Sequence, residues 1–219
     1  MKNDFAVFIL SHGRADNVKT IKTLEKAGYT GKYYIVIDDE DEQEERYREL
    51  YGDKVMQFNK LEQAAKTDYA DNHGEDRRSV VFARNYCFDL AKNLGIKYFC
   101  ELDDDYTNFE YRYIEENKLK IKSVKQLDTV FSLLVNFLEE SGALTVAMAQ
   151  GGDFIGGANS GTFKKGILRK AMNSFVCTTD RPFEFFGRIN EDTTAYCVHG
   201  MRGKLMFTLT PVSLVQTQT

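Results

Sequence analysis

The sequence predicts an α/β fold in which helices cover both faces of a mostly parallel central sheet. Residues 5–58 alternate between short apolar runs and longer amphipathic segments, in the order strand, helix, strand, helix, strand. This order is typical of parallel strands joined by helical crossovers. The runs at 5–10 and 33–37 are apolar throughout, as expected for strands buried on both faces. With 42% hydrophobic residues, the chain is predicted to form one domain, 1–219, around a full core.

The first strand is predicted at 5–10, and a loop at 11–14 follows it. The next helix is predicted to begin at Asp16 or Asn17, because either residue is a good N-cap. Gly28 is placed to end that helix.

The second strand, at 33–37, ends in an acidic pair, Asp38 and Asp39, which leads into a charged helix. A short strand is predicted at 54–58. Residues 59–78 are polar with few periodic apolar positions, so we expect an insertion or a mobile segment there.

Ser79 is predicted to cap a helix that runs to Gly95, because apolar residues recur between them at helical spacing. A strand at 98–102 follows and ends abruptly in three carboxylates at 103–105. The apolar run directly before these carboxylates distinguishes the segment from an ordinary acidic loop.

Ser123 and Gln126 are predicted to form a capping box for a further helix, which ends at Gly142. A strand is expected at 144–149. Five glycines interrupt residues 150–161, which indicates a loop or a tight hairpin close to a ligand.

The acidic strand end at 103–105 is the part of the sequence that most directly indicates a function. Like charges at one strand end repel each other unless a cation or a basic ligand neutralises them. Mg²⁺ binds proteins through one or two carboxylates together with substrate phosphates. In open α/β sheets, ligands lie beyond the carboxyl ends of the strands. The segment therefore predicts a metal–diphosphate site, with a solvated acidic loop as the alternative.

The formal net charge of -4 argues against a protein that is basic over its whole surface. The charge is unevenly placed, because residues 38–49 hold eight acids and two bases, whereas 160–205 hold eight bases and four acids. Such a basic segment either faces a polyanion or is ordinary surface. The cysteines lie in apolar stretches without C-x-x-C spacing and are expected to be buried free thiols: Cys87, Cys100, Cys177 and Cys197.

Five short motifs follow one another along the chain: Phe8-Ile9-Leu10-Ser11-His12-Gly13-Arg14, Ile35-Val36-Ile37-Asp38-Asp39, Ala83-Arg84-Asn85, Asp103-Asp104-Asp105 and Glu191-Asp192. In this order they resemble the motifs of GT-A glycosyltransferases, nucleotide-sugar-dependent enzymes with one Rossmann-like α/β domain and a D-x-D metal motif. The resemblance extends over about 5–200 by short motifs rather than extended identity. It implies a nucleotide-binding half at about 1–105 and an acceptor-binding half at about 106–219.

The resemblance also implies roles for individual residues. The implied donor-binding residues are Ser11, His12, Arg14, Asp38, Asp39, Arg84, Asp103 and Asp104. The first three would line the base and ribose pocket, the next two would contact the base or ribose, and Arg84 would offer a fork to donor oxygens. Asp103 and Asp105 would hold Mn²⁺ or Mg²⁺, with Asp105 the leading ligand and His199 a further candidate.

In inverting members of the family, a late acidic pair supplies the catalytic base, which implies Asp192 as base here and Glu191 as second candidate. Each of these residues has a structural alternative. The alternatives are helix caps for 11–14 and 190–192, a helix start for 38–39, a surface ion pair for Arg84 and a structural role for His199.

The compact size, the first loop, the acidic strand end and the glycine-rich loop look similar to a phage-associated group of these enzymes. That group is related to the TET-associated and GREB1-like glycosyltransferases and places sugars on hydroxymethylated pyrimidines in DNA. The resemblance therefore implies a UDP-sugar donor and a DNA acceptor such as hydroxymethylcytosine. The basic segment 160–205 would suit a phosphate backbone, and Phe183, Phe185 and Phe186 within it would suit an extruded base or the protein core.

Two other classes of function remain open. A nucleotidyltransferase shares this architecture and metal site, although 11–14 is a poor version of its glycine-rich, basic first loop. A non-catalytic nucleotide-binding module is the third class, disfavoured by the two acidic motifs. We find no targeting segment and no apolar run of membrane length. We therefore expect no membrane partner and a cytoplasmic location, the host cytoplasm if the chain is phage-encoded.

Overall fold

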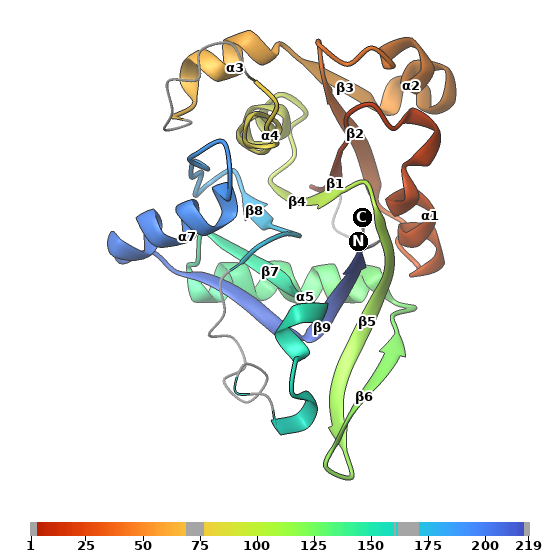
Figure 1. Cartoon of the computed structure of the whole chain (residues 1–219), viewed down its shortest axis with the longest axis vertical. Helices are drawn as coiled ribbons and strands as arrows, with labels where there is room; N and C mark the ends of the chain where they lie inside the picture. The colour runs from red at the N-terminus through yellow and green to blue at the C-terminus, as the bar shows by residue number, and fades with distance from the viewer. Residues whose placement is uncertain (1–3, 69–76, 160, 162–170, 217–219) are drawn as a thin grey trace.

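The computed structural model describes residues 4–68, 77–159, 161 and 171–216. Nine strands in these ranges form one sheet in the order β3-β2-β1-β4-β8-β7-β9-β5-β6 (Figure 1). The strands are β1 Phe5–Leu10, β2 Lys32–Asp38, β3 Val55–Phe58, β4 Tyr98–Asp103, β5 Tyr106–Glu115, β6 Lys118–Ser123, β7 Thr145–Gln150, β8 Val176–Thr178 and β9 Met206–Gln216. The helices are α1 Lys19–Lys26, α2 Glu44–Tyr51, α3 Lys60–Lys66, α4 Val81–Asn93, α5 Leu127–Ser141 and α7 Glu191–Met201, with 3-10 turns η1 Ala15–Asn17, η2 Gly52–Lys54, η3 Gly151–Phe154 and η4 Gly157–Asn159.

The α/β class is confirmed, but the sheet is mixed rather than mostly parallel. Strands β3, β2, β1 and β4 run parallel to one another, as the crossover pattern predicted. Beyond β4 the described pairings are antiparallel, except for β7 with β9. The direction changes because β8 runs back between β4 and β7 and pairs antiparallel with both.

The β5–β6 hairpin adds two strands that the sequence analysis did not predict. Its two turn residues, Glu116 and Asn117, have φ values of 51° and 59°. Left-handed conformations at both central positions fit the type I′ turn, which matches the twist of a hairpin. Glu-Asn lacks the glycine that usually marks this turn in a sequence, so the hairpin had no clear local signal.

The two faces of the sheet bury separate cores. Every residue of β1 is buried, and because side chains alternate along a strand, Phe5 and Val7 enter one core while Ala6 and Phe8 enter the other. Helices α1 and α5 pack on the first face, and α4 packs on the second. Helices therefore cover both faces, as predicted.

Three of the four cysteines are buried free thiols, as expected: Cys87, Cys100 and Cys177. Cys197 is exposed, which corrects the prediction for that residue. Helix α7 buries Ala195 and His199, so the side chain between them at 197 points to the opposite side of the helix.

The glycine stops of the helices are confirmed, whereas the predicted N-caps differ: the N-cap of α4 is Val80 rather than Ser79, and two others are wrong. Gly28, Gly95 and Gly142 have φ values of 80°, 64° and 65°, in the left-handed region that glycine adopts at helix ends. Helix α1 begins after η1 with no side-chain cap, because Asp16 pairs with Arg46 at 2.6 Å instead. Helix α5 also lacks a side-chain cap, since Ser123 belongs to β6.

Two polar segments contain more regular structure than expected. Helix α3 occupies part of 59–78, and the Asn59 side chain caps it by accepting the Glu62 N–H at 2.8 Å. Residues 69–76 of that segment lie outside the described ranges. The glycine-rich segment forms the two 3-10 turns η3 and η4.

No described helix combines the length and the apolar character that crossing a bilayer requires.

Gly28 is a position where an added methyl group should be costly. Its φ is left-handed, and a Cβ there would press against the Lys125 carbonyl oxygen, whereas Gly203 has a φ of 74° with open space around the Cβ position. We expect Gly203→Ala to lower the free energy of unfolding by about 1–2 kcal/mol through backbone strain. Gly28→Ala should cost ~1–3 kcal/mol more because of the contact. Chemical denaturation measures both losses, and equal losses would contradict the packing of 28 against 125.

Candidate functional site

A pocket of about 470 Å³ opens at the carboxyl ends of β1, β2 and β4. Six residues selected from the sequence line it: Ser11, His12, Arg14, Asp38, Asp103 and Asp104. Leu10, Val36 and Phe58 supply apolar lining. Lys60 and Arg78 also line the pocket, and sequence reasoning missed both because they follow β3 in the segment expected to be an insertion.

Asp104 holds the first loop in place. Its carboxylate accepts hydrogen bonds from Ser11 Oγ at 2.6 Å and from Arg14 Nη1 at 3.0 Å. The Arg14 backbone N–H donates to the Tyr47 hydroxyl at 2.9 Å. Burial raises the pKa of Asp104, and the bonds from Ser11 and Arg14 act in the opposite direction. Both carboxylate oxygens therefore orient the loop at 11–14.

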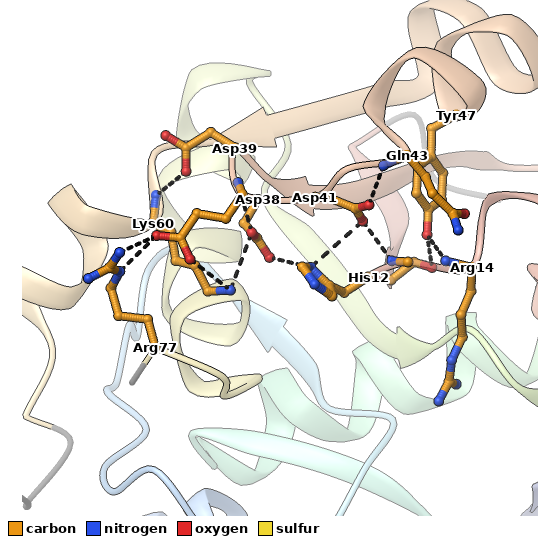
Figure 2. A network of polar contacts seen from close by, with 12 residues as sticks. His12, Arg14, Asp38, Asp39, Asp41, Gln43, Tyr47, Lys60 and Arg77 are labelled. Carbon is orange, nitrogen blue, oxygen red and sulfur yellow. Dashed lines mark hydrogen bonds and ion pairs between the residues drawn. The ribbon is translucent and has the colours of Figure 1, made fainter. Parts of the chain in front are cut away.

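Asp38 orients two side chains on the pocket wall (Figure 2). One oxygen lies 2.9 Å from His12 Nδ1, and the other accepts from Lys60 Nζ at 3.3 Å. Lys60 also lies 3.6 Å from Glu40, which in turn pairs with Arg77. Acidic and basic side chains therefore alternate outward from the pocket wall, from Asp38 to Arg77. Lys60 is buried among them.

The neighbouring acids serve the backbone. Asp39 accepts the Lys60 backbone N–H at 2.9 Å, and so points to the start of α3 (Figure 2). Asp39 is not among the residues that line the pocket, which differs from its expected contact with the base or ribose. Asp41, which sequence reasoning did not select, accepts the Gly13 N–H at 2.8 Å and lies 3.7 Å from His12. Its position in the acidic run 38–49 gave no sign of this role.

Arg84 was expected to face the donor, but the structure buries it beneath the strand end. It lies on the buried face of α4 with Cys87, Phe88 and Ala91, at the spacing that places residues on one side of a helix. Its Nη2 is 3.4 Å from Asp103, and its Nε donates to Glu191 at 3.0 Å.

These contacts join the acidic strand end to the first turn of α7. Burial opposes the charge on Arg84, but the carboxylates led by Asp103, with Glu191 among them, outweigh it, and the net effect raises the pKa of Arg84. Arg84 therefore stays charged and links Asp103 to Glu191.

Glu101 is a further member of this cluster that sequence reasoning missed. It lies two residues before Asp103 on β4, so both side chains point to one face of the sheet. Glu101 is fully buried, 3.5 Å from Arg84 Nη1. Burial raises its pKa to about 8, while Arg84 acts against the shift. Glu101 is therefore largely protonated at neutral pH. The sequence contained one sign of this residue, a single acid inside the apolar run of β4.

The structure does not bring the three expected metal ligands together. Asp103 lines the pocket, and its carboxylate accepts the Tyr106 hydroxyl at 3.1 Å. Asp105 is buried and accepts from Gln216 Nε2 at 3.1 Å, at the end of β9. His199 Nε2 lies 2.8 Å from the backbone carbonyl oxygen of residue 184. Within the ranges described, no group of three or more His, Cys, Asp or Glu side chains is arranged to hold a metal ion.

The expected catalytic pair begins α7. Asn190, with a left-handed φ of 58°, is the N-cap residue, and Glu191 and Asp192 form the first turn. Glu191 is held by Arg84, whereas Asp192 is buried beside it. The late acidic motif is thus connected to Asp103 by one arginine.

In the described part of the basic segment, at 171–205, the three phenylalanines pack within the protein, which was the second of the two expectations for them. Phe183 and Phe185 belong to the core on the α4 face of the sheet, and Phe186 packs against the His199 ring at 5.4 Å. Arg181 donates to the backbone carbonyl of residue 138, at the end of α5. Four of the eight bases, at 164, 165, 169 and 170, lie outside the described residues.

Comparisons with known proteins identify one family. The family model of the TET-associated glycosyltransferases matches residues 5–219. No curated protein sequence matches the chain. Among solved structures, the crystal structure of S. aureus TarS 1–349 is similar with a TM-score of 0.49 and 13% sequence identity. The match covers 97% of this chain and 60% of the TarS chain.

Glu101 should make the stability of the protein depend on pH. The pKa of a glutamate in the unfolded chain is about 4.3, so between that pH and about 8 the folded state binds more protons. Stability should therefore fall as pH rises through this window, by up to ~1.4 kcal/mol per pH unit. Glu101→Gln should flatten the slope, whereas Glu62→Gln, at an exposed position, should keep it.

Denaturant titrations from pH 5 to 8, without donor or added metal, measure the slope for each variant. A Glu101→Gln protein with the wild-type slope would show that Glu101 is already ionised in the folded state.

Proposed function

The chain belongs to the TET-associated glycosyltransferase family, and on this premise we propose that it transfers a sugar from a nucleotide-sugar donor to an acceptor hydroxyl. The leading donor is a UDP-sugar. The observation that carries the proposal is the pocket at the ends of β1, β2 and β4, where six residues selected from the sequence meet. Open α/β sheets bind nucleotides at this edge.

The lining of the pocket suits the two ends of a nucleotide diphosphate. Val36 and Phe58 offer apolar surface for a base, and His12 and Lys60, both oriented by Asp38, offer donors to its polar groups or to the ribose. Arg14 lies on the same wall and suits the diphosphate oxygens, because a guanidinium binds such oxygens in pairs.

Mn²⁺ or Mg²⁺ is the proposed cofactor, and Asp103 is the residue that fits it best. Its carboxylate lines the pocket and is 28% exposed. One or two carboxylates suffice for such an ion when substrate phosphates complete the shell, so the lack of a three-residue cluster in the described ranges is compatible with this site. Asp105, the leading ligand expected from the sequence, becomes the second candidate because it is buried and accepts from Gln216. The ion, when bound, would offset the charge of the leaving diphosphate.

Asp192 is the proposed base and Glu191 the second candidate. The ion pair of Glu191 with Arg84 favours Asp192 for the proton transfer. In the proposed step, the carboxylate takes the proton of the acceptor hydroxyl, and the oxygen of that hydroxyl attacks the anomeric carbon. The bond from that carbon to the diphosphate breaks, and the nucleoside diphosphate leaves with inversion at the sugar.

The proposed acceptor is a 5-hydroxymethylated pyrimidine in DNA, hydroxymethylcytosine in the leading case. The sequence resemblance to the phage-associated group supports it, since those enzymes act on such bases. A primary hydroxyl on a base extruded from the stack would be accessible to the carboxylate and the donor.

The test of the reaction is incubation with a panel of nucleotide sugars and Mn²⁺. We expect free nucleoside diphosphate to appear, and we expect Asp103→Asn to reduce its release by about 10²-fold or more because the charge on the leaving group is no longer offset. Asp53→Asn, at an exposed position away from the pocket, is the matched control. Calorimetry should show that Mn²⁺ strengthens UDP binding to the wild type and not to Asp103→Asn.

Release of a sugar 1-phosphate, with the nucleoside monophosphate transferred to the acceptor, would instead identify a nucleotidyltransferase, and no release with any donor would favour a binding module. Equal Mn²⁺ enhancement in Asp103→Asn would shift the metal assignment to Asp105, which the corresponding Asn variant tests.

Asp192→Asn should separate donor binding from transfer. We expect its donor Kd to stay within about twofold of wild type, because the residue does not line the pocket. Transfer should fall by about 10²–10⁴-fold through loss of the base. Single-turnover transfer to a 5-hydroxymethylated oligonucleotide measures the rate, and wild-type rates would exclude Asp192 as the base.

A further inference from the structure

The β5–β6 hairpin carries a row of basic and aromatic side chains outside the pocket. Cross-strand partners in an antiparallel pair share one face of the sheet. The register pairs 111 with 122, 113 with 120 and 115 with 118. We call the resulting surface the lysine face, and it consists of Tyr111, Tyr113, Glu115, Lys118, Lys120 and Lys122.

On the opposite face of the hairpin, Ile114 and Ile121 are exposed, and the charged residue Arg112 is engaged within the protein. Arg112 donates to Glu110 at 2.6 Å and to Ser213 Oγ at 3.0 Å, and its guanidinium lies 4.6 Å from the Phe154 ring centroid. On the lysine face, by contrast, none of the three lysines forms an ion pair with any residue in the described ranges. Three positive charges are therefore presented to solvent by one strand.

The hairpin holds these charges in a line. The type I′ turn and the pairing of β5 with β9 fix its backbone, and alternate residues of a strand stand about 6.8 Å apart. Lys118, Lys120 and Lys122 therefore span about 14 Å along β6. Such a row suits a linear polyanion better than a single phosphate group. Tyr113, 40% exposed on the same face, is available to stack on a base.

Strand β5 connects the lysine face to the acidic edge of the pocket along the chain. Strand β5 begins at Tyr106, directly after Asp105, and the Tyr106 hydroxyl donates to Asp103. Tyr111 follows Asp105 by six residues, or about 20 Å of extended chain. Figure 1 shows the hairpin running from the region of β4 and projecting past the rest of the sheet. Tyr111 packs against the core on the α1 and α5 side of the sheet, so a polymer on this face would approach the acidic edge from that side.

We propose that the lysine face binds the phosphate backbone of the DNA that carries the acceptor pyrimidine. This inference rests on the proposed function, which requires a DNA acceptor. The chain has a net charge of -4, so attraction to DNA must come from a local concentration of positive charge. Residues 118–125 hold four lysines and no acid, and Lys125 reaches the Lys26 carbonyl oxygen, which extends the basic surface to the end of α1.

The test compares two triple variants that remove the same charge. One is Lys118→Gln/Lys120→Gln/Lys122→Gln, and the control is Lys66→Gln/Lys92→Gln/Lys204→Gln, at exposed positions on α3, α4 and beyond α7. Fluorescence anisotropy measures binding to a labelled duplex that contains 5-hydroxymethylcytosine, over a range of salt concentrations. A second assay measures transfer to the free 5-hydroxymethylated deoxynucleoside, which has no backbone.

We expect the lysine-face variant to bind DNA at least 10-fold more weakly and the control within about twofold of wild type. The slope of log K against log salt should fall by about 2.7, or 0.9 for each lost phosphate contact. KM for DNA should rise, while transfer to the nucleoside stays unchanged. Tyr113→Ala should weaken binding to a single strand more than Tyr113→Leu does, since both lose the ring but Leu keeps apolar area.

Wild-type affinity and salt slope in the lysine-face variant would overturn the inference, and the lysines would then serve only to protect an edge strand from pairing. Equal weakening in both triple variants would also overturn it, because binding would depend on net charge alone. Loss of binding to phosphatidylserine vesicles with DNA binding unchanged would assign the face to a membrane surface instead. If the wild type transfers sugar to neither substrate, the proposed function fails, whereas lysine-dependent DNA affinity still supports the binding surface.

Discussion

The buried guanidinium of Arg84 is the constraint on which the site depends. An arginine without water around it is stable only with anionic partners, and the fold supplies Asp103 from β4 and Glu191 from α7. Asp103 and Glu191, which are 88 residues apart in the sequence, are consequently held on either side of one side chain. Glu101, largely protonated, limits the excess of negative charge in the cluster. The strand end and the start of α7 therefore have a fixed relation to each other before any ligand is bound.

Acidic side chains of the pocket wall are likewise paired with neighbouring groups. Asp104 is engaged by the first loop, and Asp38 by His12 and Lys60, so the acids of the wall orient neighbours rather than stand open to solvent. Groups that are fixed in this way lose little freedom when a ligand arrives. An acidic sequence thus builds a pocket whose lining includes Arg14, Lys60 and Arg78.

The sequence was most informative where one element alone determines the outcome. Uninterrupted apolar runs located β1, β2 and β4, and glycines located the helix ends at 28, 95 and 142, because burial and left-handed backbone are local requirements. Most of the polar residues after the three strands do meet at the pocket, since parallel strands bring their carboxyl ends to one edge, but Asp39 and Asp105 do not line it. The features that were missed depend on distant partners: β8 pairs backward with β4, the face of Arg84 is set by the packing of α4, and Lys60 reaches Asp38 only once α3 has formed.

Strand β9 ends beside the acidic edge, where Gln216 donates to Asp105. Gln216 therefore lies next to the expected metal-binding acids. An affinity tag or fluorescent fusion close to this residue would bring foreign histidines or bulk near the expected metal site. A polyhistidine sequence there would compete for added manganese, and it would give misleading titrations for reasons unrelated to the enzyme.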